Sequence, residues 1–152
     1  MSSFSLSTVK ASAAYNIQDL GTWAPVGYNY TTSGGFVKAA QANLWSAGEK
    51  LVVGSIDGSF GPATYQAVKN FQSKNGLSVD GNIGPGTWGL MEDYTIILDS
   101  RSRKFVHPNS PTYFTRFAQY AVGGGTVDNH WDLGYKSSGD YAGQGGTIWT
   151  DY

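Results

Sequence analysis

Apolar positions recur at helical spacing in the middle of the chain. One face of an amphipathic helix repeats at i, i+3, i+4 and i+7. Two stretches have this spacing: Val37, Ala40, Gln41 and Leu44, and then Thr64, Ala67, Val68 and Phe71. The first ends before Gly48 and the second at Asn75-Gly76, and glycine is common just after the end of a helix. A third, shorter helix is predicted from Pro85 to Met91, with proline in its first position.

An eight-residue phrase precedes the second and third of these helices. Residues 57–64 read DGSFGPAT and residues 80–87 read DGNIGPGT, an offset of 80 − 57 = 23 residues. Asp-Gly favours a tight turn, because Asp hydrogen-bonds the backbone ahead of it and Gly accepts a positive φ. Gly-Pro then starts a helix, because proline at the first helical position loses no needed N–H. The chain from Phe36 to Met91 is therefore predicted to be three helices joined by two similar loops.

After the third helix the pattern changes to short apolar runs. Residues 94–98 predict a short buried strand, residues 103–106 predict a partner that pairs with it across a polar turn, and residues 147–150 predict one more strand. Ser110-Pro111 is a good helix start, and the following Phe114, Phe117, Ala118 and Ala121 would share a helical face. The same stretch also alternates, so the pattern leaves a strand open there.

Together these patterns predict an α+β fold in three parts. They are an N-terminal extended segment (residues 1–35), a three-helix domain (36–91), and a Gly/Tyr-rich C-terminal segment (92–152) with short strands and one candidate helix. Both flanking segments are rich in aromatic residues and poor in charge, which is unlike the usual composition of disordered chains. We therefore expect them to be ordered by packing on the helical domain or on another chain.

Composition excludes several classes of partner and chemistry. The 152 residues have a formal net charge of −1, so we expect no nucleic-acid partner and no broad attraction to an anionic membrane. Since no apolar run approaches about 18 residues, we expect no membrane insertion. The chain has no cysteine, which excludes disulfides, thiolate zinc sites and cysteine nucleophiles. Met1 to Ala14 lacks the pattern of a secretion signal, as in a mature secreted protein behind a start Met or a phage protein released by lysis.

The segment from Phe36 to Met91 resembles a peptidoglycan-binding domain, of the small three-helix type found in bacterial and phage cell-wall enzymes. The matching residues are Val37, Gln41, Leu44, the phrase 57–64, Ala67-Val68, Phe71-Gln72, Gly76-Leu77, Val79-Asp80-Gly81 and 84–88. Ala40 stands where the family usually has a larger aliphatic residue, Trp45 and residues 48–50 replace the usual end of the first helix, and residues 51–55 alter the first loop. The resemblance implies peptidoglycan as the partner and implies no cofactor.

The paired loops are predicted to flank a shallow groove. Exposed N–H groups and an aromatic floor would suit the amides, carboxylates and methyl groups of a peptidoglycan stem peptide. The candidate ligand-binding residues are Asp57, Ser59, Phe60, Asp80, Asn82 and Trp88. Each also has a purely structural interpretation, in which the aspartates cap turns and the large apolar side chains fill the core.

No catalytic residue and no metal site are predicted. Asp128, His130 and Asp132 alternate, so on a strand they would share one face and could approach a cation. A catalytic zinc usually takes three protein ligands, and the longer His and Asp motifs of zinc peptidases are missing, so we interpret these residues as polar loop residues. Glu49 and Glu92 are the only glutamates. A muramidase needs a carboxylate pair across the cleaved bond, whereas Glu92-Asp93 fits the end of a helix.

We therefore expect non-catalytic binding of peptidoglycan, in the extracellular cell wall or on a phage particle. Two alternatives stay open. One is a structural or assembly protein, of a phage particle or a secreted fibre, in which the flanking segments join subunits into a homo-oligomer. The other is a small cell-wall hydrolase whose chemistry lies in residues 93–152.

Overall fold

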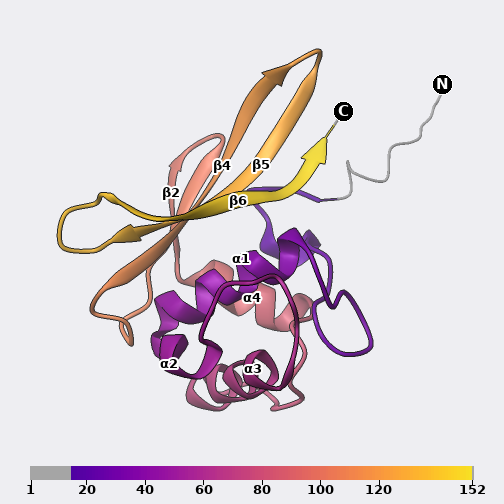
Figure 1. Ribbon diagram of the computed structural model, residues 1–152, viewed down its shortest axis with the longest axis vertical. Helices are drawn as coiled ribbons and strands as arrows, with labels where there is room; N and C mark the ends of the chain where they lie inside the picture. Colours follow the sequence, from indigo (N-terminus) through magenta and orange to yellow (C-terminus); the bar gives the residue numbers. More distant parts are fainter. Residues whose placement is uncertain (1–14, 152) are drawn as a thin grey trace.

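The computed structural model describes residues 15–151, which form a layer of helices beneath a twisted β-sheet (Figure 1). The helical layer contains α1 (Gly35–Leu44), α2 (Lys50–Val53), α3 (Pro62–Lys74) and α4 (Pro85–Asp93). A π-helical turn, η4 (Trp45–Glu49), joins α1 to α2, and a short 3-10 helix, η3 (Leu20–Thr22), precedes them. The sheet contains β2 (Thr95–Asp99), β3 (Ser102–Phe105), β4 (Tyr113–Gly123), β5 (Thr126–Tyr135) and β6 (Tyr141–Asp151). The fold is therefore α+β, as predicted.

The three predicted helices are present, and proline opens two of them. Pro62 and Pro85 begin α3 and α4, each after a glycine in an extended conformation. Gly48 was expected to end the first helix, but it kinks the helical path instead, with φ +89. A Cβ at Gly48 would lie 2.6 Å from the carbonyl oxygen of Asn109, so the backbone there approaches the segment that connects β3 to β4. The extra helix α2 follows this kink and occupies part of the stretch in which the first loop departs from its usual form.

The sheet is an antiparallel meander in which strands adjacent in sequence are adjacent in space. The predicted pairing of β2 with β3 is confirmed, with Thr95 opposite Phe105. The prediction that this first strand is buried is wrong, because β2 is an edge strand whose Ile96, Ile97 and Leu98 are 49–63% exposed. The strand predicted at residues 147–150 is part of the longer β6.

The helix predicted after Ser110-Pro111 is also wrong, because that stretch forms β4. It pairs with β5 from Tyr113 opposite Tyr135 to Gly123 opposite Thr126. Alternate residues then face the helical layer, and Phe117 is fully buried there. Pairing with the next strand, β5, decides the structure here, since the local pattern fits either period.

One aromatic core joins the N-terminal segment, the helices and the sheet. The ring of Trp23 packs edge-on against Phe36, Trp88, Phe117 and Trp149, with centroids 5.0–6.1 Å apart. Phe36 of α1 stacks on Trp149 of β6 at 5.5 Å. A Cβ at Gly35 would lie 2.2 Å from the carbonyl oxygen of Ile148, so α1 begins directly against β6. Aromatic side chains contribute much of the buried area in such a core.

Polar contacts also connect the N-terminal segment, the helices and the sheet. The carboxylate of Glu92, at the end of α4, accepts a hydrogen bond from the N–H of Leu20 at 2.6 Å and lies 3.7 Å from the guanidinium of Arg103 in β3. Residues 15–35 and 92–151 thus pack on the helical layer, while the same expectation for residues 1–14 and 152 lies outside the described residues. No helix within residues 15–151 is long and apolar enough to cross a membrane.

Candidate ligand-binding site

The first loop of the repeated phrase is held by a glutamine of the preceding helix. The side-chain oxygen of Gln41 accepts a hydrogen bond from the N–H of Gly58 at 2.9 Å. Its nitrogen lies 3.1 Å from the carboxylate of Asp57, the carbonyl oxygen of Ser59 and the hydroxyl of Thr64. The carboxylate of Asp57 also accepts from the N–H of Ser59 at 2.9 Å. A single buried amide therefore satisfies donors and acceptors across the whole turn.

The second loop repeats this arrangement with Gln72 of α3. Its side-chain oxygen accepts from the N–H groups of Asp80 and Gly81 at 3.1 and 2.9 Å. Its nitrogen lies 2.9 Å from the carboxylate of Asp80, 2.8 Å from the carbonyl oxygen of Asn82 and 3.2 Å from the hydroxyl of Thr87. The carboxylate of Asp80 accepts from the N–H of Asn82 at 2.9 Å. The repeat in sequence is therefore a repeat in hydrogen bonding, with one glutamine for each loop.

These hydrogen bonds keep the first loop negatively charged. The pKa of Asp57 is lowered by the N–H of Ser59, by the side chain of Gln41 and, to a smaller extent, by the positive charge of Lys38. Each of these groups favours the carboxylate over the carboxylic acid. Asp57 is exposed, so its free carboxylate oxygen faces solvent as an acceptor.

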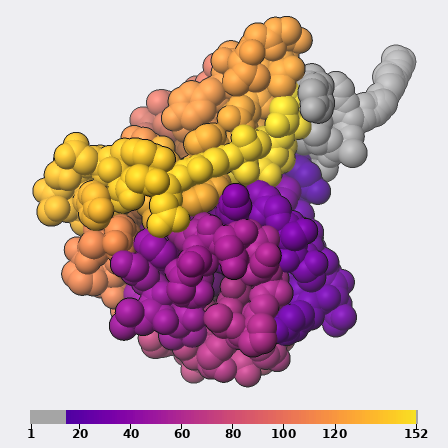
Figure 2. Space-filling model, viewed as in Figure 1, coloured from indigo at the N-terminus to yellow at the C-terminus, as the bar shows by residue number. Residues whose placement is uncertain are grey.

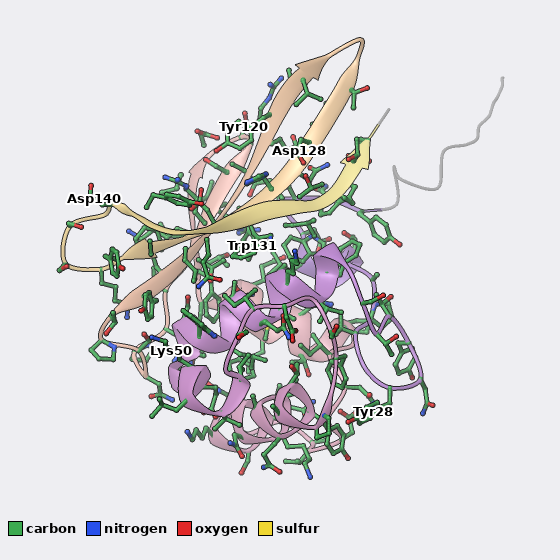
Figure 3. The ribbon with its side chains drawn as sticks, viewed as in Figure 1. Tyr28, Lys50, Tyr120, Asp128, Trp131 and Asp140 are labelled. Carbon is green, nitrogen blue, oxygen red and sulfur yellow. The ribbon has the colours of Figure 1, made fainter. Side chains whose placement is uncertain are left out.

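Two tyrosines lie between the loops, and we call them the inter-loop tyrosine pair. The ring of Tyr28 is 5.2 Å from the rings of both Phe60, in the first loop, and Tyr65, in α3. A Cβ at Gly81 would lie 2.1 Å from the ring of Tyr65, so this ring packs directly against the second loop. Tyr28 is 48% exposed, and Figure 3 shows it on the side of the helical layer away from the sheet. The pair thus forms an apolar surface that joins one loop to the other.

A cleft opens beside the second loop. It has a volume of about 360 Å³ and is lined in part by Leu77, Ser78, Asp80, Asn82 and Pro85. Asp80 is exposed and Asn82 is half-buried. Carboxylate, amide and hydroxyl groups therefore face this cleft next to the apolar side chain of Leu77.

The structure divides the predicted ligand residues into two groups. Asp57 and Ser59 are exposed on the first loop, and Asp80 and Asn82 line the cleft of the second loop. Phe60 and Trp88 are buried instead, at 6% and 0% exposure. The indole N–H of Trp88 donates to the carbonyl oxygen of Ala24 at 3.0 Å, and its ring packs on Trp23. Trp88 is therefore a core residue, and the expectation that it forms a groove floor is wrong.

Residues 33–91 match the family model of a peptidoglycan binding domain. This segment is similar to the peptidoglycan-binding domain family. It spans α1 to α4 and contains both glutamine-held loops, so the resemblance predicted over residues 36–91 is confirmed. No curated protein and no solved structure matches the chain.

Four residues of this surface were missed from the sequence as site residues. Gln41 and Gln72 are among the residues that match the family, but they were not predicted as site residues. They could have been recognised because each is a polar residue on the buried face of an amphipathic helix. Tyr65 follows Thr64 on α3 and gave no signal of its own. Tyr28 lies outside the peptidoglycan-binding domain, 60 − 28 = 32 residues before Phe60 in the sequence. Only the folded chain brings the two rings into contact.

Both histidines and Asp132, which lie outside the peptidoglycan-binding domain, have local partners. His130 lies 3.1 Å from Asp128, while Asp132 forms an ion pair with Arg116 at 2.7 Å. His107 is buried and hydrogen-bonded to Asn75 at 3.0 Å. Within residues 15–151, no group of three His, Cys, Asp or Glu side chains could hold a metal ion.

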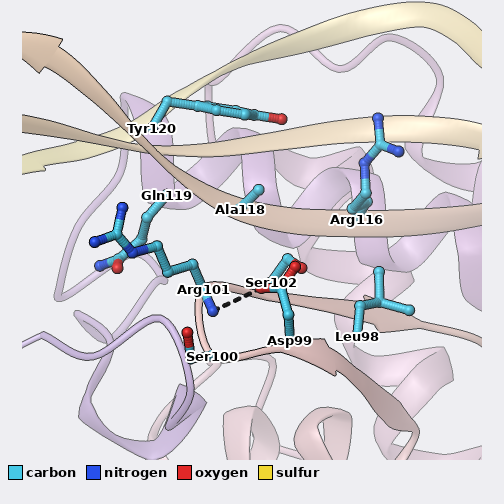
Figure 4. Close-up of a pocket in the computed structure, with 9 residues that line it drawn as sticks. All are labelled: Leu98, Asp99, Ser100, Arg101, Ser102, Arg116, Ala118, Gln119 and Tyr120. Carbon is cyan, nitrogen blue, oxygen red and sulfur yellow. Dashed lines mark hydrogen bonds between the residues drawn. The ribbon is translucent and has the colours of Figure 1, made fainter.

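A separate cleft of about 520 Å³ lies at the β2–β3 turn, away from both loops (Figure 4). Asp99, Arg101, Arg116 and Tyr120 contribute to its lining. The N–H of Arg101 donates to the carboxylate of Asp99 at 2.8 Å, which lowers the pKa of Asp99. The guanidinium of Arg116 already binds Asp132.

Proposed function

We propose that this protein binds bacterial peptidoglycan without cleaving it, at the surface formed by the inter-loop tyrosine pair and the cleft of the second loop. The observation that carries this proposal is the double glutamine arrangement, which fixes two similar loops on either side of the inter-loop tyrosine pair. Tyrosine faces suit sugar rings and methyl groups, while Asp80 and Asn82 suit the hydroxyl and amide groups of the polymer. The match of residues 33–91 to the family supports the same partner.

The environment of the two glutamates supports a binding role rather than a hydrolytic one. The side chain of Glu49 is 2% exposed and binds the ammonium of Lys74 at 2.6 Å and the amide of Asn70 at 3.0 Å. The carboxylate of Glu92 accepts a hydrogen bond from the N–H of Leu20. General acid catalysis requires a carboxyl group that reaches the substrate, and these two carboxylates instead fasten one element to another. We place the protein in the extracellular cell wall or on a phage particle, where this polymer is its partner.

Co-sedimentation with insoluble peptidoglycan tests the proposed surface. We expect Tyr28→Ala to bind about tenfold more weakly than the wild type, because covering an aromatic side chain contributes about 1.5–3 kcal/mol. Tyr120→Ala is the matched control, since Tyr120 is similarly exposed, at 46%, but lies on β4. Equal binding by Tyr28→Ala and the wild type would exclude the inter-loop surface.

The edge of the sheet supports a second candidate function, assembly into a homo-oligomer. β2 presents three consecutive exposed apolar residues, Ile96, Ile97 and Leu98, on an edge strand, and such edges pair readily with other strands. If two copies pair through β2, the mass in solution will rise with concentration, and Ile97→Lys will remain a monomer. A concentration-independent monomer mass for the wild type would remove this candidate.

A further inference from the structure

A third cleft lies at the junction of the helical layer and the sheet. It has a volume of about 240 Å³ and is lined by Lys38 of α1, Ile56 before the first loop, Trp131 of β5, and Tyr141, Gly143, Gln144 and Gly145 of β6. In Figure 2 the yellow strand β6 lies directly above the magenta helices along this junction. The family match includes Lys38 and Ile56 but none of the residues from the sheet, so this cleft is a feature of this chain's own architecture.

Trp131 brings an unused hydrogen-bond donor to this cleft. Its side chain lies between the sheet and α1 (Figure 3) and is 2% exposed. Its indole N–H is buried and has no acceptor among the described residues. The indole N–H groups of the other four tryptophans all donate, to Asn16, Gly54, Ala24 and Asp151. Buried donors are almost always paired, so an unpaired one beside a cleft indicates a missing acceptor.

Lys38 brings an unpaired positive charge to the same cleft. No acidic group of the described residues lies within 4.0 Å of its ammonium. Its methylene chain packs on the first loop, where a Cβ at Gly58 would lie 3.0 Å from Cε of Lys38. None of the residues that line the cleft is acidic. The cleft therefore offers one cation and one buried N–H donor and has no acidic residue in its lining, while the charge of Lys38 also acts on the carboxylate of Asp57 in the first loop.

Glycines keep the cleft open on the side of β6. Gly143 has φ +84, a conformation that residues with a side chain rarely adopt. A Cβ at Gly145 would lie 2.8 Å from the carbonyl oxygen of Trp131. A larger residue at either position would strain the strand or crowd Trp131. Gln144, between them, adds an amide to the lining.

We propose that this cleft binds a carboxylate group, with the ammonium of Lys38 and the indole N–H of Trp131 as its donors. A carboxylate has one negative charge and two acceptor oxygens, which matches one cation and one neutral donor. That the natural source is a carboxylate of the peptidoglycan stem peptide rests on the proposed function. The position of Lys38 against the first loop would then place a stem-peptide end next to the loop that also carries Asp57.

Titration of the isotope-labelled full chain with N-acetyl-D-alanyl-D-alanine, followed through the indole N–H resonances, tests this assignment. We expect the resonance that Trp131→Phe removes to shift with the dipeptide and to stay unchanged with the C-terminal amide of the same dipeptide. Lys38→Gln should weaken dipeptide binding at least tenfold. Lys104→Gln, which removes one positive charge from β3 in the sheet, should bind like the wild type.

Each other outcome overturns the assignment. Equal shifts with the amide would show that the carboxylate is not recognised, and equal binding of inorganic phosphate would show an unselective anion site. Unchanged affinity in Lys38→Gln would remove the cation from the site. These results are distinguishable from failure of the proposed function, because the soluble dipeptide tests the cleft and co-sedimentation of Tyr28→Ala tests the inter-loop surface.

Discussion

Gln41 and Gln72 are buried amides that act as the centres of the two loops. The side-chain oxygen of Gln41 accepts from one loop N–H and that of Gln72 from two. The nitrogen of each lies within hydrogen-bond distance of the aspartate, a loop carbonyl oxygen and a helix hydroxyl. A glutamine suits this place because its amide has both donors and acceptors at the end of a side chain that reaches across the turn. The loops are thus shaped from the helix side, which leaves their outer faces free for a ligand.

Gln72→Leu should therefore destabilise the protein by about 2–3 kcal/mol, because it leaves buried N–H groups of the second loop without an acceptor. Urea denaturation measures this change. Gln66→Leu is the matched control on the same helix, where the side chain is exposed and hydrogen-bonds only Asn70. A loss of similar size in the control would show that the second loop does not depend on Gln72.

For single residues, the sequence predicts the turns better than it predicts which side chains form the ligand-binding surface. Asp57 and Asp80 lie where the Asp-Gly turns were expected, and Pro62 and Pro85 start helices. Trp88 is a ligand-binding candidate from the sequence, because a tryptophan after a helix start fits a groove floor as well as a core. Its full burial against Trp23, with the indole N–H donating to the carbonyl oxygen of Ala24, shows that it is core.

His107, which follows β3, connects the end of α3 to the sheet. The ring of His107 packs against that of Tyr94 in a tilted arrangement, with centroids 4.3 Å apart. Its two nitrogens are hydrogen-bonded to Asn75 at 3.0 Å and to the N–H of Asn109 at 3.1 Å. Since that N–H donates to Nδ1, Nδ1 carries no proton and the ring is neutral. Burial of the ring, with a smaller effect of Lys136, lowers the pKa of His107 below its ordinary value.

This arrangement predicts a loss of stability in mild acid. Because the folded pKa lies below the unfolded value of 6.5, stability is complete above that pH. As the pH falls below it, the unfolded chain takes up a proton that the folded chain does not, so the free energy of unfolding decreases. His107→Gln should be less stable at neutral pH but should lose less stability between pH 7 and pH 5. Parallel pH profiles for the two proteins would contradict this role of His107.

The helices were predictable as elements, whereas the longest strands were not. α1, α3 and α4 are marked by local features, namely period, proline and glycine. The structure of residues 113–123 depends on pairing with residues 126–135 across a Gly-Gly-Gly turn, a contact that the local pattern does not contain. The exposure of β2 also follows from its place in the sheet, since an apolar run alone cannot distinguish a central strand from an edge strand.

For the whole molecule, the shared aromatic core predicts one cooperative unit. Trp23 contacts α1, α4, β4 and β6 through its ring, so neither layer keeps its core when the other unfolds. Thermal unfolding followed by far-ultraviolet and near-ultraviolet circular dichroism should give coincident single transitions. Trp23→Ala should cost about 3–5 kcal/mol, as removal of large core side chains does. Two separate transitions would show that the helical layer and the sheet are independent.

One incubation tests both parts of the proposed function, namely that the protein binds peptidoglycan and that it leaves the polymer intact. Wild-type protein is mixed with purified insoluble peptidoglycan, the pellet is assayed for protein, and the supernatant is assayed for soluble muropeptides. We predict that the protein moves to the pellet and that the supernatant contains no more muropeptide than a blank without protein. Protein that stays wholly in the supernatant across ordinary salt and pH would contradict binding, and release of muropeptides would contradict the non-catalytic role.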